Sequence, residues 1–382
     1  MRRKARIVFV LGKFGVGGAE KQLANLIAHR PERARGLDVH VITLLPTQSS
    51  DVEQRFFAAG ASTSLVDRSM LAFPHFFYQL FGEMRRLRPV VVSTILDSSV
   101  GAWGRLAAWL SGAPVIVHSD RQLAAEGTRA HLLLRPFLDR RTTRFLPNAH
   151  AIARRLEAEG VPSDKIVVMP NGVDTRVFDP TTNHGARSAY GIADAAIVLG
   201  FLGRFAREKR VDLLIDALQR MPLQERPDHV LLAGDGVTLP EVRALAQADA
   251  WTRERCTFIG SIDDTVGFLA SIDVLVLPSD AEGLPNVVLE AMAMARPVIG
   301  TAVSEIPHMV GDTGIIVPPG DAEALAGAIG AMRRMSSAER CELGLRARRR
   351  TEREYDIVHR SAAFWDAHLD LLPRKLLNRC DA

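Results

Sequence analysis

The sequence predicts an α/β protein with two domains, each built around a parallel β-sheet with helices on both faces. Three observations support this prediction. The 382 residues suffice for two domains of ordinary size, which hold roughly 100–200 residues each. Short β-branched apolar segments alternate with helical patterns along the chain, which favours βαβ units. Residues 174–195 are rich in turn formers, lack periodicity and separate two series of such segments.

The expected strands are nearly continuous apolar runs, as is typical of strands that a parallel sheet buries on both faces. In the first series they are Ile7–Leu11, Val39–Leu44, Val90–Ile95, Val115–His118 and Ile166–Met169. In the second they are Ile197–Leu202, Val230–Ala233, Thr257–Ile259, Val274–Leu277, Val298–Ile299 and Ile315–Val317. We therefore expect an N-terminal domain over residues 1–178, a C-terminal domain over 179–352 and a helical C-terminal segment over 353–382.

Composition narrows the class of protein. A net charge of +4 is too small to indicate a nucleic-acid partner by itself. The three cysteines, Cys256, Cys341 and Cys380, are far apart, which argues against both a zinc motif and a disulfide framework. No apolar run reaches the roughly 18 residues of a transmembrane helix. We therefore expect a cytoplasmic protein without a zinc motif, a disulfide framework or a transmembrane helix.

A glycine-rich segment directly follows the first expected strand. It reads GKFGVGGAE over residues 12–20, and a helical pattern comes after it. Glycines allow close approach of the backbone to a ligand, and a helix N-terminus favours an anion. Gly17 and Gly18 could thus contact a diphosphate or a sugar, or form an ordinary strand-to-helix turn. The spacing is not G-x-G-x-x-G and no acid ends the second strand, which disfavours a nicotinamide cofactor.

A basic loop follows the first strand of the second series. It reads GRFAREK over residues 203–209 and precedes a helix that begins near Val211. Arginine offers a planar fork for phosphate and lysine a point charge. Arg204 and Lys209 could therefore hold an anion at the strand end, although a solvated basic loop would have the same sequence.

An acidic motif follows the strand Val274–Leu277. It reads PSDAEGLPNVVLEAM over residues 278–292, and Pro285 fits the first position of a helix. Glu282 then precedes the helix and Glu290 lies inside it, where it could bind ribose hydroxyls or face solvent. We expect a bound ligand to meet the backbone N–H groups at the start of this helix, in the segment formed by Gly283, Leu284, Pro285 and Asn286.

Taken in order, these motifs resemble glycosyltransferase family 4, the group 1 transferases. The residues that carry the resemblance are Gly17–Glu20, Asn171–Asp174, Gly203-Arg204 with Lys209, the E-x7-E pair Glu282 and Glu290, and Pro318–Asp321. The resemblance spans nearly the full chain. It implies the GT-B fold, with two Rossmann-like domains whose parallel sheets face each other across a central cleft. It also implies a C-terminal helix that crosses back to the N-terminal domain.

The resemblance further implies a function and a set of roles. The donor would be a nucleotide-diphosphate sugar, transferred with retention of configuration and without a metal or other cofactor. Arg204 and Lys209 match the diphosphate-binding pair, Glu290 the ribose-binding residue and Glu282 the residue beside the donor sugar. Gly17 and Gly18 match the phosphate and sugar loop. His118 resembles a histidine near the donor sugar, or is a structural strand-end histidine. The candidate catalytic residues are thus Glu282, His118, Arg204 and Lys209.

Some positions depart from the family pattern. Ala295-Arg296 stands where the family usually has glycine before Pro297. After the next strand, Ala302, Ser304-Glu305 and His308 replace a common Asp, a glycine pair and a Glu. Because that loop would lie beside the donor, these changes bear on donor identity.

The predicted function is sugar transfer to a glycan or lipid-linked acceptor in cell-surface polysaccharide or glycolipid synthesis. Two alternatives stay open: a sugar-nucleotide epimerase on the same fold, and an inactive sugar-nucleotide-binding module. Glycoside hydrolysis is disfavoured. Eight helical residues would separate Glu282 from Glu290 by about 12 Å, beyond the roughly 5–9.5 Å that hydrolases use.

An aromatic run beside basic clusters bears on membrane contact. Residues 73–81 contain five aromatic side chains and precede Arg85, Arg86 and Arg88, while residues 121–144 contain six arginines against Glu126 and Asp139. Such patterns suit peripheral binding to an anionic membrane, here the inner face of the plasma membrane. The same pattern would result from a helix that packs on the core with a solvated basic rim.

Overall fold

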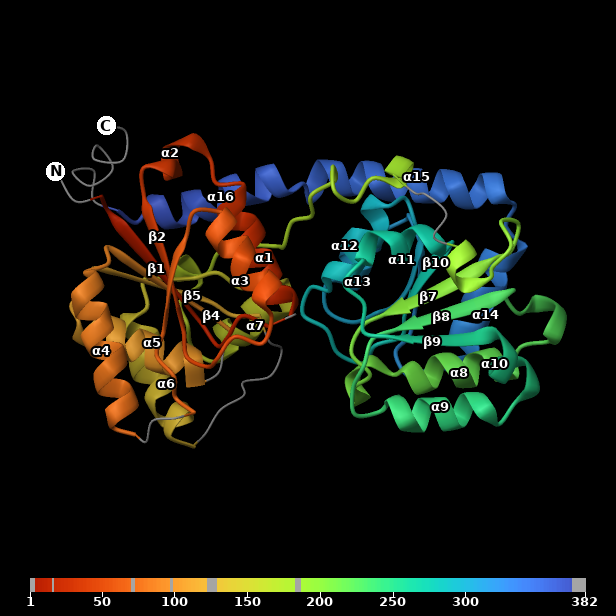
Figure 1. Cartoon of the computed structure of the whole chain (residues 1–382), viewed down its shortest axis with the longest axis horizontal. Helices are drawn as coiled ribbons and strands as arrows, with labels where there is room; N and C mark the ends of the chain where they lie inside the picture. The colour runs from red at the N-terminus through yellow and green to blue at the C-terminus, as the bar shows by residue number, and fades with distance from the viewer. Residues whose placement is uncertain are drawn as a thin grey trace. The chain divides into compact units, whose positions relative to one another are not determined.

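The computed structural model describes residues 4–15, 17–69, 73–96, 99–121, 129–182 and 187–372. Glu126, Cys380 and the end of the expected C-terminal segment lie outside these ranges. The chain forms two compact units (Figure 1). Unit 1 comprises Met1–Gly172 together with Ile357–Ala382, and unit 2 comprises Val173–Asp356.

Unit 1 contains a six-stranded parallel sheet with the strand order β3-β2-β1-β4-β5-β6. The strands are β1 (Arg6–Leu11), β2 (Asp38–Thr43), β3 (Ser62–Leu65), β4 (Val91–Ile95), β5 (Val115–Ser119) and β6 (Arg144–Phe145). The helices are α1 (Gly18–Ala28), α2 (Glu32–Arg35), α3 (Ser50–Ala58), α4 (His75–Leu87), α5 (Ser99–Leu110), α6 (Arg129–Arg141), α7 (His150–Ala158) and α16 (Ile357–Leu369). The order reverses between β1 and β4, which creates the kind of switch point where α/β sheets bind ligands.

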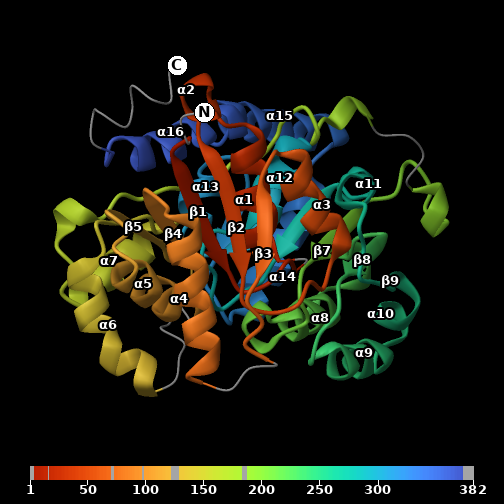
Figure 2. The same cartoon turned by 60° about the vertical axis from the view of Figure 1, so that its left-hand side comes forward.

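The alternation of side chains along β1 builds the core on both faces of this sheet. Ile7, Phe9 and Leu11 point to one face and pack with α1, α3 and α16. Val8 and Val10 point to the other face and pack with α4 and α5. Figure 2 shows α3 and α4 on opposite sides of β1 and β2. Because both faces are covered here, the central strand β1 is continuously apolar after Arg6, as the sequence predicted.

The chain returns to unit 1 in its last helix. In α16, the buried Trp365 donates from its indole Nε1 to the carbonyl oxygen of Leu26 in α1 at 2.8 Å. The hydroxyl of Ser361 donates to the same oxygen at 2.9 Å, and Phe364 stacks on Phe9. The helix therefore belongs to the core of unit 1 although it is more than 300 residues from β1 in sequence.

The strand predicted at Ile166–Met169 is wrong. This segment makes one isolated bridge, between Ile166 and Phe145, and the N–H groups of Val167 and Met169 donate to the carbonyl oxygens of Phe145 and Pro147 at 2.9 and 2.7 Å. The facing chain continues into Pro147, which has no N–H to donate to a ladder. Two strands were also missed: β3, which has a polar sequence at the edge of the sheet, and β6, which has only two residues.

Unit 2 contains a second six-stranded parallel sheet, with the strand order β12-β11-β10-β7-β8-β9. The strands are β7 (Val198–Leu202), β8 (His229–Ala233), β9 (Cys256–Gly260), β10 (Val274–Leu277), β11 (Val298–Thr301) and β12 (Ile315–Val317). The helices are α8 (Val211–Arg220), α9 (Leu239–Gln247), α10 (Ala250–Arg255), α11 (Thr265–Ser271), α12 (Asn286–Ala293), α13 (Ile306–Val310), α14 (Ala322–Arg334) and α15 (Ser337–Glu354). All six strands predicted for this half are confirmed, as is the α/β class of the whole chain.

Among the residues that the structure describes, no helix is both long and apolar enough to cross a bilayer.

Candidate functional site

The basic loop and the acidic motif of unit 2 lie together at one edge of the sheet. They follow β7 and β10, which are neighbouring parallel strands, so their carboxyl ends meet at the same edge. The backbone N–H of Asp280 donates to the carbonyl oxygen of Glu208 at 2.8 Å, and Arg210 pairs with the Asp280 carboxylate at 2.8 Å. The structure thus brings two of the predicted motifs into direct contact.

An ion pair between Lys209 and Glu282 is the centre of this site. The ammonium Nζ lies 2.6 Å from the carboxylate Oε1. The Lys209 side chain is 17% exposed and that of Glu282 is 8% exposed, so solvent screens the pair less than it would a surface pair. An ammonium has three donors, and one hydrogen bond to Glu282 leaves Lys209 able to bind a phosphate oxygen as well.

A chain of two buried hydroxyl groups positions the carboxylate of Glu282. Ser279 donates from its hydroxyl to Oε1 of Glu282 at 2.7 Å. Thr301, at the end of β11, donates to the backbone carbonyl oxygen of Ser279 at 2.5 Å. Both side chains are fully buried. The sequence motif at residues 278–292 includes Ser279, but no role was predicted for it. Thr301 was not predicted at all, because its only sequence signal is its position at the end of a strand.

Arg204 lies on the same loop in a different environment. Its side chain is 76% exposed and pairs with Glu208, four residues later in the sequence, at 3.0 Å. Exposed pairs of this kind contribute about 0–1 kcal/mol, so a stronger anion can recruit the guanidinium at little cost. Arg204 is therefore accessible, whereas Lys209 is held in place.

A glycine pair after β8 supports the basic loop and was not recognised from the sequence. Gly234 and Gly236 both have positive φ angles, 131° and 152°. A Cβ atom at Gly234 would overlap the carbonyl oxygen of Gly203, and one at Gly236 would overlap that of Phe205. Only glycine permits this approach, which sets the backbone on both sides of Arg204.

The predicted helix after the acidic motif is α12, with a small correction at its start. Pro285 was expected at the first helical position, but it is the N-cap, and the helix begins at Asn286. Glu282 precedes the helix and Glu290 is half-buried within it, as expected. Gly283 and Leu284 lie between Glu282 and the N-cap, so the whole segment that was expected to meet the ligand adjoins the Lys209–Glu282 pair in sequence. A helix N-terminus carries partial positive charge, which suits an anionic ligand.

His118 and the glycine loop lie in unit 1. His118 pairs with Thr94 on β4, one pair before the end of that ladder, and is 1% exposed. Its Nδ1 lies 2.8 Å from the hydroxyl of Thr94 on β4, and its ring packs edge-on against Phe145. The structure therefore gives His118 a role in the core, and the predicted contact with a donor sugar stays a prediction.

Gly17 and Gly18 form the start of α1, with Gly17 as its N-cap. Glu20 lies against Gly17 and is almost fully buried. Burial raises the pKa of the Glu20 carboxyl, an effect that its own backbone hydrogen bond and the charges of Arg121 and Lys13 oppose. The loop thus ends in a desolvated acid.

Asn171 and Arg121 complete this edge of unit 1. Arg121 donates to the side-chain oxygen of Asn171 at 3.0 Å, and burial lowers the pKa of the Arg121 guanidinium to about 10. The amide of Gln22 lies 2.8–2.9 Å from the backbone N–H and carbonyl of Gly172. The glycine loop and the Asn171-Gly172 motif, which are far apart in sequence, therefore share one site.

Two family models match the chain, one in each unit. The model described as Glycosyltransferase Family 4 matches residues 16–177, and that described as Glycosyl transferases group 1 matches residues 196–334. Together they cover most of both sheets and all the motifs on which the sequence prediction rested, apart from those at residues 12–15.

Similar curated proteins include several bacterial transferases. UDP-Gal:alpha-D-GlcNAc-diphosphoundecaprenol alpha-1,3-galactosyltransferase of Escherichia coli is 27% identical over 284 residues, which is 67% of this chain and 72% of that protein. Lipopolysaccharide core biosynthesis glycosyltransferase LpsE of Rhizobium meliloti is 40% identical over 140 residues, which is 36% of this chain and 39% of that protein. N-acetyl-alpha-D-glucosaminyl L-malate synthase of Bacillus anthracis is 29% identical over 180 residues, 47% of each chain. The last two alignments thus span half or less of the relative.

Solved structures with the same fold cover nearly the whole chain. Anabaena Alr3699/HepE in complex with UDP-glucose has a TM-score of 0.81 at 18% identity over 96% of this chain and 100% of that one. The lipopolysaccharide-biosynthesis glycosyltransferase WaaG has a TM-score of 0.70 at 18% identity over 94% and 99%. These neighbours confirm the predicted GT-B fold. The chain belongs to the group 1 glycosyltransferases of the family 4 type.

Proposed function

We propose that the chain transfers a sugar from a nucleotide-diphosphate donor to a glycan or lipid-linked acceptor, in the synthesis of a cell-surface polysaccharide or glycolipid. The observation that carries this proposal is the Lys209–Glu282 pair, which lies where β7 and β10 end. The printed names of relatives support the substrate classes, since one uses UDP-Gal and a diphosphoundecaprenol-linked acceptor and another acts in lipopolysaccharide core synthesis.

The chemistry of this site follows from its charges. Breaking the bond between the sugar and the β-phosphate leaves negative charge on the departing diphosphate. Lys209, already oriented by Glu282, and the accessible Arg204 would meet this charge together with the N-terminus of α12. Such preorganised groups stabilise a transition state without further reorganisation. Because the chain itself supplies these cations, we propose that transfer requires no metal.

The finer roles rest on the resemblance together with the geometry of each unit. Glu290 in α12 would bind the ribose, and Glu282 would lie beside the donor sugar. Gly17 and Gly18 would contact phosphate or sugar, and His118 would limit the space around the sugar. We propose a retaining reaction in which the leaving phosphate accepts the proton of the acceptor hydroxyl.

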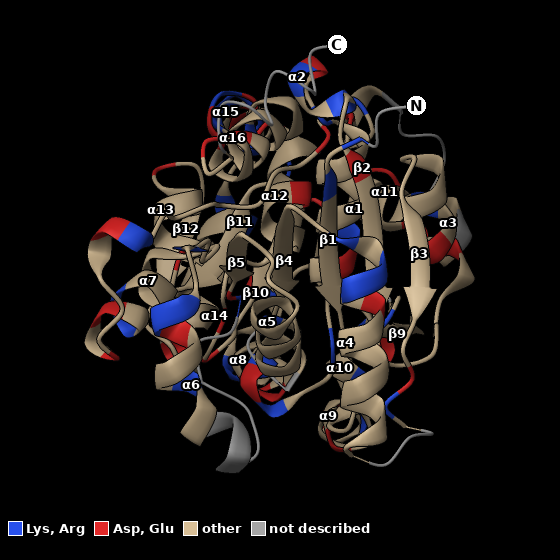
Figure 3. Ribbon diagram, turned by 90° about the vertical axis from the view of Figure 1, so that its left-hand side faces the viewer, with Lys and Arg blue, Asp and Glu red and all other residues tan. Residues whose placement is uncertain are grey.

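The exposed face of α4 supports a peripheral membrane contact. Phe76 points into the core, but Phe73 and Tyr78 are 61% and 72% exposed. At the other end of the same helix, Arg85 and Arg86 are exposed, and Figure 3 shows basic segments at the ends of α4 and α6. We propose that this face binds anionic lipid at the inner surface of the plasma membrane, with about 1 kcal/mol from each basic residue near the bilayer. Vesicle co-sedimentation should then decrease at high salt; equal, negligible binding at low and high salt would exclude the contact.

A panel of nucleotide sugars tests the donor assignment, beginning with UDP-sugars. A true donor at 100 times its Kd should stabilise the chain by about 2.7 kcal/mol, and the matching free sugar should not. An isomerised sugar nucleotide formed without acceptor would identify an epimerase instead. Donor binding without either hydrolysis or transfer would identify an inactive binding module.

A further inference from the structure

A cavity of 520 Å³ lies between α1 and α3 in unit 1. Its lining combines four small apolar side chains with polar and basic ones; the residues are Ala24, Asn25, Ala28, Arg30, Arg35, Arg55, Ala58 and Ala59. The volume falls within the roughly 300–1,000 Å³ typical of small-molecule sites. Ala28 lies ten residues along α1 from Gly18, about 15 Å at 1.5 Å per residue, so the cavity is separate from the glycine loop.

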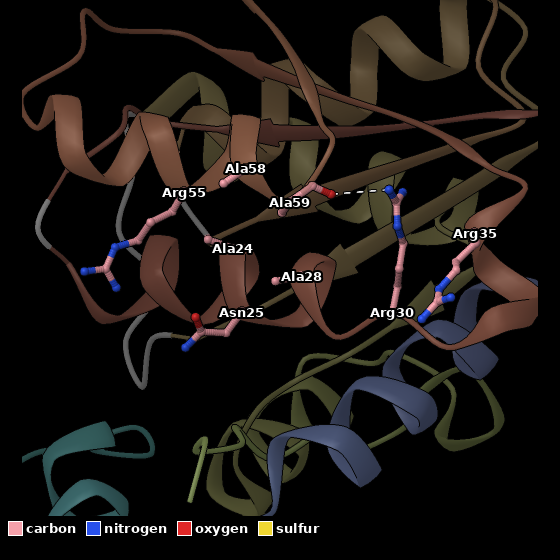
Figure 4. A pocket seen from close by; sticks show the side chains of 8 residues that line it. All are labelled: Ala24, Asn25, Ala28, Arg30, Arg35, Arg55, Ala58 and Ala59. Atoms are coloured by element: carbon pink, nitrogen blue, oxygen red, sulfur yellow. Dashed lines mark hydrogen bonds between the residues drawn. The ribbon is translucent and has the colours of Figure 1, made fainter. Parts of the chain in front are cut away.

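Arg30 is the half-buried group at one end of this cavity. Its Nη2 donates to the backbone carbonyl oxygen of Ala59 at 3.3 Å (Figure 4). Its Nη1 is also buried, and no described residue provides that atom with a hydrogen-bond partner. A buried, unsatisfied donor on a charged group costs free energy. One arm of the fork therefore holds α3, and the other lacks a partner among the described residues.

Arg35 lies at the same end of the cavity, and Arg55 lies at the opposite end (Figure 4). Burial, and after it the charge of Arg35, lowers the pKa of Arg30, while Asp38 acts in the opposite direction. Because Arg30 and Arg35 both line the cavity, an anion bound between them would reduce their mutual repulsion.

Two carboxylates near the cavity form only weak, exposed ion pairs with its arginines. Glu32 pairs with Arg35 at 2.6 Å and Asp51 pairs with Arg55 at 3.1 Å, both as exposed neighbours within three or four residues. Pairs of this kind contribute about 0–1 kcal/mol. A phosphate, which accepts paired hydrogen bonds from arginine forks, can compete with them.

We propose that the cavity between α1 and α3 binds a small molecule carrying a phosphate monoester, with the phosphate between Arg30 and Arg35. The four alanines then form the apolar wall beneath the organic part of the ligand, while Asn25 and Arg55 bind its hydroxyl groups. The phosphate could come from a soluble sugar phosphate or from a lipid headgroup, and both present the same chemistry to the arginines.

Isothermal titration with three probes tests this site: inorganic phosphate, glucose 6-phosphate and vesicles that contain phosphatidic acid. Saturable binding of phosphate or glucose 6-phosphate would identify a soluble ligand, and binding of the vesicles alone a lipid headgroup. We expect R30Q and R35Q to weaken every probe that binds by at least about tenfold, the scale of one charge-assisted hydrogen bond. R55Q should weaken glucose 6-phosphate but not inorganic phosphate.

Two controls keep the outcome clear. R154Q removes an exposed arginine of α7 in the same unit and should change nothing. K209A should leave binding intact, which separates this cavity from the donor site and makes the test independent of the proposed function. R30Q also removes the hydrogen bond to Ala59 and could prevent folding. In that case the R35Q variant, which changes an exposed side chain, tests the proposal. Absence of saturable binding by all three probes, loss of binding in K209A, or unchanged binding in R35Q would overturn the proposal.

Discussion

The edges of the two sheets that carry the sequence motifs differ in how their charged groups are paired. In unit 2, the cation Lys209 lies 2.6 Å from the anion Glu282, and a buried hydroxyl fixes the carboxylate. In unit 1, His118 is bonded to a neutral hydroxyl, and the pKa of the buried Glu20 is raised by desolvation. We propose that the first arrangement stabilises the charge that appears on the leaving diphosphate and that the second shapes the space around the sugar. On this proposal the charge chemistry belongs to unit 2.

The largest expected effect comes from the two cations of unit 2. Lys209→Ala and Arg204→Ala should each lower kcat by about 10²–10³, the usual result of removing one preorganised donor. Only Lys209→Ala should also lower the free energy of unfolding, by about 1–3 kcal/mol, because it leaves a buried carboxylate without its partner.

Turnover with a verified donor and denaturant unfolding measure these two effects. The matched control is Arg253→Ala, which removes an exposed arginine on α10 and should change neither quantity. Near-normal turnover in both Lys209→Ala and Arg204→Ala would mean that they do not bind the diphosphate.

A smaller effect should come from the hydroxyls behind Glu282. Ser279→Ala removes the 2.7 Å bond to the carboxylate and should lower kcat by about tenfold, with little change in donor Kd. Thr301→Val, which removes a bond one step further away, should have a weaker effect, and Thr301→Ser should retain full activity. Comparing kcat with Kd across these variants distinguishes positioning of Glu282 from a general loss of packing, which would affect Thr301→Ser as well.

The smallest effect concerns stability against pH in unit 1. Burial lowers the pKa of His368 from 6.5 to about 4, so the unfolded chain binds a proton there before the folded chain does. This neutral histidine therefore contributes stability above pH 6.5 that is lost as the pH falls toward 4. The loss should be about 1 kcal/mol between pH 6.5 and 5.5. His368→Gln should flatten the slope of unfolding free energy in this range, and an unchanged slope would assign the acid sensitivity to other groups.

The strands were predictable where burial on both faces makes the sequence nearly continuously apolar, as in β7, β8, β10 and β11 of unit 2. The edge strands β9 and β12 are only partly buried, but their short apolar runs were also recognised. The edge strand β3 and the two-residue β6 give no such signal, and Ile166–Met169 is apolar without forming a ladder.

The spacing of residues within each motif likewise indicated which loops form the candidate site, but it could not indicate how their side chains pair. Lys209 and Glu282 are 73 residues apart, and only the order of β7 and β10 in the sheet brings them together. Thr301 reaches Ser279 because β11 lies beside β10, and His118 reaches Thr94 because β5 lies beside β4.

The most direct test of the central claim is release of nucleoside diphosphate from a verified donor, measured with and without acceptor in the presence of excess chelator. We predict acceptor-dependent release by the wild-type chain that chelator does not reduce, and a loss of about 10²–10³ in Lys209→Ala. If chelator abolishes release and magnesium or manganese restores it, or if Lys209→Ala releases nucleotide at the wild-type rate, the claim that the protein's own cations stabilise the leaving diphosphate is contradicted.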